Sequence, residues 1–80
     1  MKVPTIRLFG PAREIAGRAV DELPGTSVAE ITEAAAHRYG DRFCALLPAC
    51  RVWVNGRSAE PATEICDTDE VAILPPVSGG

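Results

Sequence analysis

The first apolar residues of this chain alternate with polar ones. Between residues 3 and 9, Ile6 and Leu8 are separated by one polar residue, which is the period of a strand with one buried face. Pro4 has no backbone N–H to donate to a neighbouring strand, so the strand is expected to start there. It ends before the breaker pair that follows, Gly10-Pro11.

The clearest element is a helix in the first half of the chain. Ser27 with Glu30 three residues later is a capping-box pattern, which predicts a helix start at this point. Apolar residues then recur at helical spacing: Val28, Ile31, Ala35 and Tyr39. Gly40 supplies a stop, so we expect a long helix over residues 27–39.

Shorter elements surround this helix. Residues 12–17 can form one or two helical turns closed by Gly17, and residues 18–23 can form a second short strand. Further along, Asn55-Gly56 is a strong hairpin signal between strands expected at 51–54 and 57–59. A last strand at residues 70–74 must end at Pro75-Pro76, because proline has no N–H to donate.

The connection over residues 42–49 is the least regular part of the pattern. It has apolar residues at Phe43, Leu46 and Leu47, followed by Pro48. We expect a connecting loop or a single turn whose side chains fill the core.

The expected element order is therefore β-β-α-β-β-β, with one long helix. This order predicts a single α+β domain over residues 1–74, in which the helix covers one face of a mixed sheet and the last strand pairs beside the first. The other face should be at least partly open. An open face with exposed apolar residues is where a partner protein could dock.

Length and composition agree with one small domain. The chain has 80 residues, of which 46% are hydrophobic and 24% charged. No stretch approaches the roughly 20 apolar residues that cross a membrane, and no signal-peptide pattern is present, so we expect a cytoplasmic protein with no membrane partner. The net charge of −3 and the lack of clustered basic residues argue against a nucleic-acid partner.

Side chains that usually carry chemistry are sparse. The three cysteines, Cys44, Cys50 and Cys66, form no CxxC pair, so neither a disulfide framework nor a zinc site is indicated, and each is expected to be buried or half-buried. His37 has no second histidine at ligand spacing and is expected at the surface or a helix end. The chain has no P-loop motif and no evident metal cluster, so any ATP must be bound by another protein.

The end of the sequence, LPPVSGG, has few side chains with chemistry of their own. We expect an extended tail over residues 75–80, in which Pro75 and Pro76 restrict the free conformations and so lower the entropy lost on insertion into a partner. Six extended residues span about 20 Å at most, which is enough to reach a buried site while the domain stays outside.

The last four residues suit such an insertion. Val77 is a candidate apolar anchor and Ser78 a small polar spacer. Gly79 and Gly80 have no side chains, so their backbone could pass through a narrow channel and approach a nucleotide phosphate closely.

Three stretches resemble the ubiquitin-like sulfur carriers of the β-grasp fold, and within them the MoaD-type small subunit of molybdopterin synthase. They are LFGPAREIAG (residues 8–17), VNG (54–56) and DTDEVAILPPVSGG (67–80). The element order agrees too, so the resemblance covers nearly the whole chain. A terminal Gly-Gly alone is a weak signal, but the Pro-Pro-Val before it and the loop with Arg13-Glu14 are features that thiamin-pathway carriers generally lack.

The resemblance implies a protein co-substrate whose reactive group is the carboxylate of Gly80. An E1-like activating enzyme of the MoeB type would adenylate it with ATP, and a sulfur donor such as a cysteine desulfurase or a rhodanese would lead to a thiocarboxylate. The sulfur would pass to precursor Z, a cyclic pyranopterin monophosphate, bound to a large subunit of the MoaE type in a heterotetramer. This would form the dithiolene of molybdopterin, with catalysis in the large subunit and no tightly bound cofactor or metal in this chain.

Two other functions share the same tail. One is a sulfur carrier for thiamin or cysteine synthesis, and the other is a ubiquitin-like modifier that forms an isopeptide bond with lysine. Outside the tail, Arg13 and Glu14 could contribute to an active site, but a solvated helical turn with a local ion pair is the simpler expectation. Phe9 and Trp53 could lie on a docking face, but core packing is more frequent for isolated aromatic residues, so they are expected to pack in the core.

Overall fold

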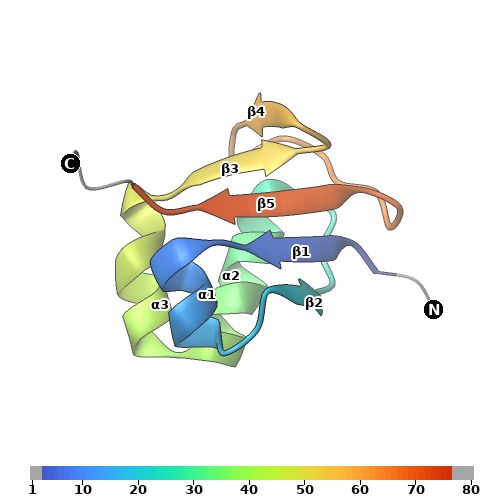
Figure 1. Ribbon diagram of the computed structural model, residues 1–80. Helices are drawn as coiled ribbons and strands as arrows, with labels where there is room; N and C mark the ends of the chain where they lie inside the picture. Colours follow the sequence, from blue (N-terminus) through green and yellow to red (C-terminus); the bar gives the residue numbers. More distant parts are fainter. Residues whose placement is uncertain (1–2, 77–80) are drawn as a thin grey trace.

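The computed structural model describes residues 3–76, which form a mixed five-stranded sheet with helices packed against it (Figure 1). The strands are β1 (Thr5–Leu8), β2 (Val20–Glu22), β3 (Arg51–Val54), β4 (Arg57–Ala59) and β5 (Glu70–Leu74). The helices are α1 (Gly10–Ala16), α2 (Val28–Tyr39) and α3 (Asp41–Leu46), and the 3₁₀ turn η1 (Leu47–Ala49) follows α3. This is the α+β architecture that the sequence predicts.

The sheet has the strand order β2-β1-β5-β3-β4, so the first and last strands lie at its centre. β1 and β5 are parallel, with Ile6 opposite Val71 and Leu8 opposite Ile73, and the other neighbouring pairs are antiparallel. The prediction that the last strand pairs beside the first is confirmed. Because β5 runs in the same direction as β1, it ends where β1 ends and β3 begins.

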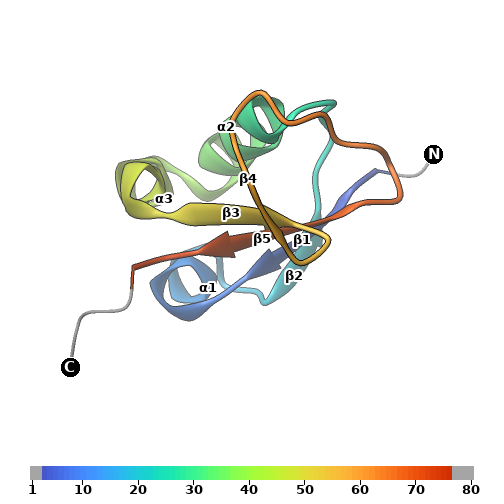
Figure 2. The same ribbon diagram turned by 90° about the horizontal axis from the view of Figure 1, so that it is seen from above.

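One hydrophobic core lies between the sheet and the helices. Figure 2 shows α2 and α3 on the same side of the sheet. Alternate residues of the central strands face them and are almost fully buried: Ile6, Leu8, Val71 and Ile73. The predicted helical stripe of α2 meets them through Val28, Ile31 and Ala35. Burying each such aliphatic side chain contributes about 1.5–3 kcal/mol, with alanine at or below the lower end, so this core is the main source of stability.

The start of α2 follows the predicted capping box only in part. The Ser27 hydroxyl accepts a hydrogen bond from the Glu30 amide at 3.2 Å, as predicted. The Glu30 carboxylate, however, accepts from the backbone amide and the hydroxyl of Thr26, at 2.8 and 3.0 Å. These two bonds hold the pKa of the Glu30 carboxyl below its ordinary value, with the backbone bond the larger cause.

The prediction for residues 42–49 is wrong, because they form most of α3 and the whole of η1 instead of a loop. Gly40, with φ at 95°, turns the chain between α2 and α3, a conformation that glycine adopts without strain. Phe43 is fully buried, so the expected filling of the core is confirmed. The spacing of Phe43, Leu46 and Leu47 is itself helical and is the signal that identifies α3.

The hairpin between β3 and β4 is confirmed. Asn55 and Gly56 have φ values of 50° and 82°, the positive pair that a two-residue type I′ turn requires. The Asn55 side chain also donates to Oδ1 of Asp69 at 3.0 Å and accepts from the Glu70 amide at 2.9 Å. It thereby joins the hairpin turn to the start of β5.

Candidate functional site

The predicted tail begins at a corner of the sheet. β5 ends at Leu74, which lies opposite Arg51 of β3, and the chain then leaves the sheet through half-buried Pro75 and exposed Pro76. A groove surrounds this point and is lined by Ala49, Arg51, Trp53, Leu74, Pro75 and Pro76. The prediction that the two prolines end the last strand is confirmed, and the root of the tail is flanked by one cation and one aromatic ring.

The rest of the predicted tail lies outside the described residues. This applies to Val77, Ser78, Gly79 and Gly80. Their insertion into a partner, and the reactivity of the Gly80 carboxylate, stay predictions.

The sheet face opposite α2 carries a row of side chains that leads toward this corner. The strand register places Val20, Arg7, Ala72 and Trp53 next to one another on four neighbouring strands. Val20 is 47% exposed and Trp53 is 38% exposed. Arg7 forms an ion pair with Glu70 on the same face, with 2.8 Å between Nε and Oε2. The expected open face therefore exists and presents apolar surface beside the root of the tail.

Phe9 and Trp53 are surface residues, so the prediction that they pack in the core is wrong. Trp53 lies between Val52 and Val54, which pack against the core, and strand alternation turns its ring to the open face. Phe9 follows the buried Leu8 and is the N-cap of α1, where it is 43% exposed. Alternation along β3 was the signal that could have placed Trp53 correctly.

The cysteines only partly match their prediction. Cys44 and Cys66 are exposed, whereas Cys50 is half-buried as expected. The Cys50 thiol donates to the Leu46 carbonyl at 3.4 Å, and its burial raises its pKa. The thiol is therefore less readily ionised than a free cysteine, and it is not placed as a nucleophile.

The other chemistry-bearing residues lie apart from one another. His37 is exposed in the last turn of α2, as predicted. Arg13 and Glu14 are exposed on α1, also as predicted, but the expected ion pair between them is absent from the described residues. Within residues 3–76, no three histidine, cysteine, aspartate or glutamate side chains lie close enough to hold a metal ion. In the same range, no helix has the length and apolar character needed to cross a membrane.

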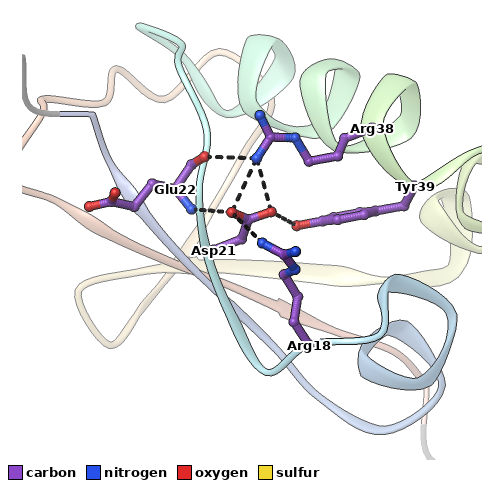
Figure 3. Close-up of polar contacts among 5 residues, drawn as sticks. All are labelled: Arg18, Asp21, Glu22, Arg38 and Tyr39. Atoms are coloured by element: carbon purple, nitrogen blue, oxygen red, sulfur yellow. Dashed lines mark hydrogen bonds and ion pairs between the residues drawn. The ribbon is translucent and has the colours of Figure 1, made fainter.

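A buried carboxylate, Asp21 of β2, is a feature that the sequence pattern does not reveal (Figure 3). The Tyr39 hydroxyl donates to its Oδ2 at 2.5 Å, and Nη1 of Arg38 lies 3.1 and 3.2 Å from its two oxygens. Nη1 of Arg18 lies 3.3 Å from Oδ1, and the Glu22 amide donates to the same oxygen at 2.8 Å. These contacts join β2 to the end of α2.

The contacts also set the charge state of this cluster. Burial alone raises the pKa of the Asp21 carboxyl, but the hydrogen bonds from Tyr39, the Glu22 amide and Arg38, with the charge of Arg18, lower it below its ordinary value. Burial and the bond to Asp21 raise the pKa of the Tyr39 hydroxyl. Asp21 is thus an ionised carboxylate already surrounded by donors of its own chain, and its role is structural.

Solved structures share this architecture over nearly the whole chain. Small archaeal modifier protein 1 (SAMP1) of Haloferax volcanii is 26% identical with a TM-score of 0.80, and the match covers 96% of this chain and 98% of SAMP1. A chain of the Amycolatopsis orientalis BexX/CysO complex is 25% identical with a TM-score of 0.82, covering 98% and 100%. A putative molybdopterin converting factor subunit 1 of Pyrococcus furiosus is 27% identical with a TM-score of 0.80, covering 92% and 97%.

The fold is therefore the β-grasp fold that the resemblance implied. Comparison with curated protein sequences gives no match. The sequence model of the ThiS family matches residues 6–80, from β1 through the final Gly-Gly. A match of this extent establishes the family, while the relatives named above include a modifier protein, a CysO complex and a molybdopterin converting factor subunit. The chain belongs to the ThiS family of ubiquitin-like sulfur carriers.

Proposed function

We propose that this protein is the sulfur-carrying small subunit of a molybdopterin synthase. The observation that carries the proposal is the corner at Leu74, where β5 ends and Pro75 and Pro76 leave the sheet beside Arg51 and Trp53. In the sequence, Val-Ser-Gly-Gly follows these prolines. The FGPAREIAG segment and the likeness to the Pyrococcus furiosus protein support the molybdopterin assignment. The group that reacts is the carboxylate of Gly80.

This carboxylate needs activation, because its charge is delocalised over two oxygens that are poor leaving groups. An E1-like enzyme of the MoeB type supplies ATP in trans and forms the acyl adenylate. A persulfide on a cysteine desulfurase or a rhodanese then attacks the acyl carbonyl and AMP leaves, and a thiol reduces the resulting acyl disulfide to a thiocarboxylate. Gly79 and Gly80 admit the close approach that this exchange requires, since a side chain at either position would crowd the reacting carbonyl.

The thiocarboxylate donates its sulfur to precursor Z in the active site of a large subunit of the MoaE type. The open face is the surface that we assign to partner docking, because it exposes the apolar side chains of Trp53 and Val20 and, at Trp53, adjoins the root of the tail. Two structural relatives are complexes, one of BexX with CysO and one of subunits 1 and 2 of the Helicobacter pylori molybdopterin-converting factor. The cytoplasm, where ATP and the partner enzymes are present, is the expected location.

The likeness to SAMP1 and to the BexX/CysO complex favours a second candidate, a carrier for another sulfur pathway or a protein modifier. The two candidates are separated by incubating the thiocarboxylated protein with precursor Z and a MoaE-type large subunit. Formation of molybdopterin is expected from the first proposal. Lysine-linked adducts in cell extract, with no conversion of precursor Z, would favour the modifier.

A further inference from the structure

The basic residues of this chain are almost all arginines. Of its eight lysine and arginine residues, Lys2 is the one lysine, and it precedes the described residues. A guanidinium stays protonated at any physiological pH and does not act as a nucleophile, whereas the amine of lysine does when it is deprotonated. Residues 3–76 therefore present no side-chain amine.

The ion pairs that the arginines form do not require arginine rather than lysine. Three of them form ion pairs, and each uses one nitrogen: Nε of Arg7 on Glu70, and Nη1 of Arg18 and of Arg38 on Asp21. None is the paired, two-nitrogen contact that a lysine ammonium is unable to make. The remaining four are exposed and form no ion pair among residues 3–76: Arg13, Arg42, Arg51 and Arg57. Ion pairing among the described residues therefore does not explain the absence of lysine.

The proposed chemistry at Gly80 supplies a reason for the absence of lysine from the domain. An acyl adenylate is attacked by any accessible amine: a C–N bond forms at the carbonyl carbon, the C–O bond to the phosphate breaks, and AMP leaves. The nitrogen then releases a proton to water, and an amide remains. When the amine belongs to another copy of the carrier, one carrier is removed from the sulfur pathway and two copies are joined.

We propose that the domain withholds amine acceptors, so that the activated end is not consumed by other copies. This inference rests on the proposed activation of Gly80. Copy-to-copy amides are then confined to Lys2 and to the α-amino group that every chain carries. Branched chains, in which several carrier copies are joined by amide bonds to lysines of the domain, therefore do not form.

Substitution of exposed arginines tests the proposal. Arg42→Lys and Arg57→Lys each place an amine on the domain at positions with no ion pair, and Lys2→Arg removes the native one. Each protein is incubated with an E1-like activating enzyme and ATP but no sulfur donor, and adducts are measured on reducing gels and located by tandem mass spectrometry. We expect severalfold more adduct in the two lysine variants, located at the new lysine, and loss of the Lys2 adduct in Lys2→Arg.

A second arm separates this inference from the proposed function. Each variant is prepared with a Gly80 thioester by intein cleavage, so that no activating enzyme is needed, and pyrophosphate release is measured in the enzymatic arm. Coupling of the lysine variants through the thioester, without enzymatic pyrophosphate release, would count against the proposed function alone, since a lysine on the domain would still be an acceptor for an activated Gly80. Normal pyrophosphate release, with Arg42→Lys and Arg57→Lys no more modified than the wild type in both arms, would overturn the inference alone.

Discussion

Arg51 at the start of β3 lies directly opposite Leu74, the last residue of β5. The pair marks the point at which the backbone leaves the sheet, and Trp53 lines the same groove. A partner that holds the residues after Pro76 must approach this corner. The position of the corner is fixed by the antiparallel pairing of β3 with β5, which places the end of the last strand beside the start of β3.

Replacing Trp53 by alanine should weaken docking more than it weakens the fold. Its ring is 38% exposed on the open face beside the tail root, and a tryptophan in such a position is a typical binding hot spot. We expect binding to a MoaE-type large subunit, measured by calorimetry, to weaken by about 2 kcal/mol or more, which is roughly 30-fold in Kd. The thermal midpoint should change little.

The matched control is Glu33→Ala, at an exposed position on α2, on the other side of the sheet. Its affinity for the large subunit should equal that of the wild type. If Trp53→Ala binds as tightly as this control, the open face is not the docking surface.

The Asp21 cluster should be a large contributor to stability. Asp21→Asn removes the charge that accepts hydrogen bonds from Tyr39 and Arg38, at a site where the side chain is only 7% exposed. We expect the free energy of unfolding at neutral pH to fall by about 2–4 kcal/mol, measured by denaturant titration. Glu22→Gln, a neighbouring exposed position, should cost far less.

The same cluster predicts a pH dependence. The pKa of Asp21 is lowered from its ordinary value of 3.8, so the carboxylate stabilises the folded state fully above that value. This contribution is lost as the pH falls below 3.8 through the lower pKa of the folded state. The difference in unfolding free energy between the wild type and Asp21→Asn should therefore shrink below pH 3.8. A difference that stays constant with acidification would contradict the assignment.

The hairpin turn offers a test of side-chain hydrogen bonding at constant backbone geometry. Asn55→Gly keeps a residue that accepts a φ of 50° but loses the bonds to Asp69 and to the Glu70 amide. We expect a loss of about 1–2 kcal/mol in the free energy of unfolding, from these bonds and the added freedom of glycine. An unchanged denaturation midpoint would show that water replaces the bonds without cost.

Deleting Gly80 should abolish sulfur loading without destabilising the fold. Among the described residues, the core cluster extends no further along the chain than Ile73. We therefore expect a thermal midpoint close to that of the full chain, together with complete loss of sulfur loading. A large drop in the thermal midpoint would mean that the end of the chain packs on its own domain.

The elements that the sequence predicts well are those in which a regular spacing of apolar residues ends at a glycine or a proline. β1, α2 and β5 each combine a clear pattern with a glycine or proline at the end, and each lies where the pattern placed it. Helix α3 was missed because Gly40 ends one helix and also permits the next, and because Pro48 suggested a loop although it lies inside η1.

The contents of the candidate site were harder to predict than its location. The two prolines at the end of β5 are a local signal, but the positions of Arg51 and Trp53 beside them depend on which strand pairs with β5. The Asp21 cluster joins β2 to the far end of α2, so Arg38 and Tyr39 meet Asp21 only through tertiary packing. No local pattern distinguishes Asp21 from its exposed neighbour Glu22.

The most direct test of the central claim is the mass of the C-terminal peptide. The protein is incubated with an E1-like activating enzyme, ATP and a sulfur source, and the peptide that contains Gly80 is measured by mass spectrometry. We expect an increase equal to the exchange of one oxygen for one sulfur, located at Gly80. An unmodified peptide, obtained with an activating enzyme that loads another carrier in parallel, would contradict the central claim.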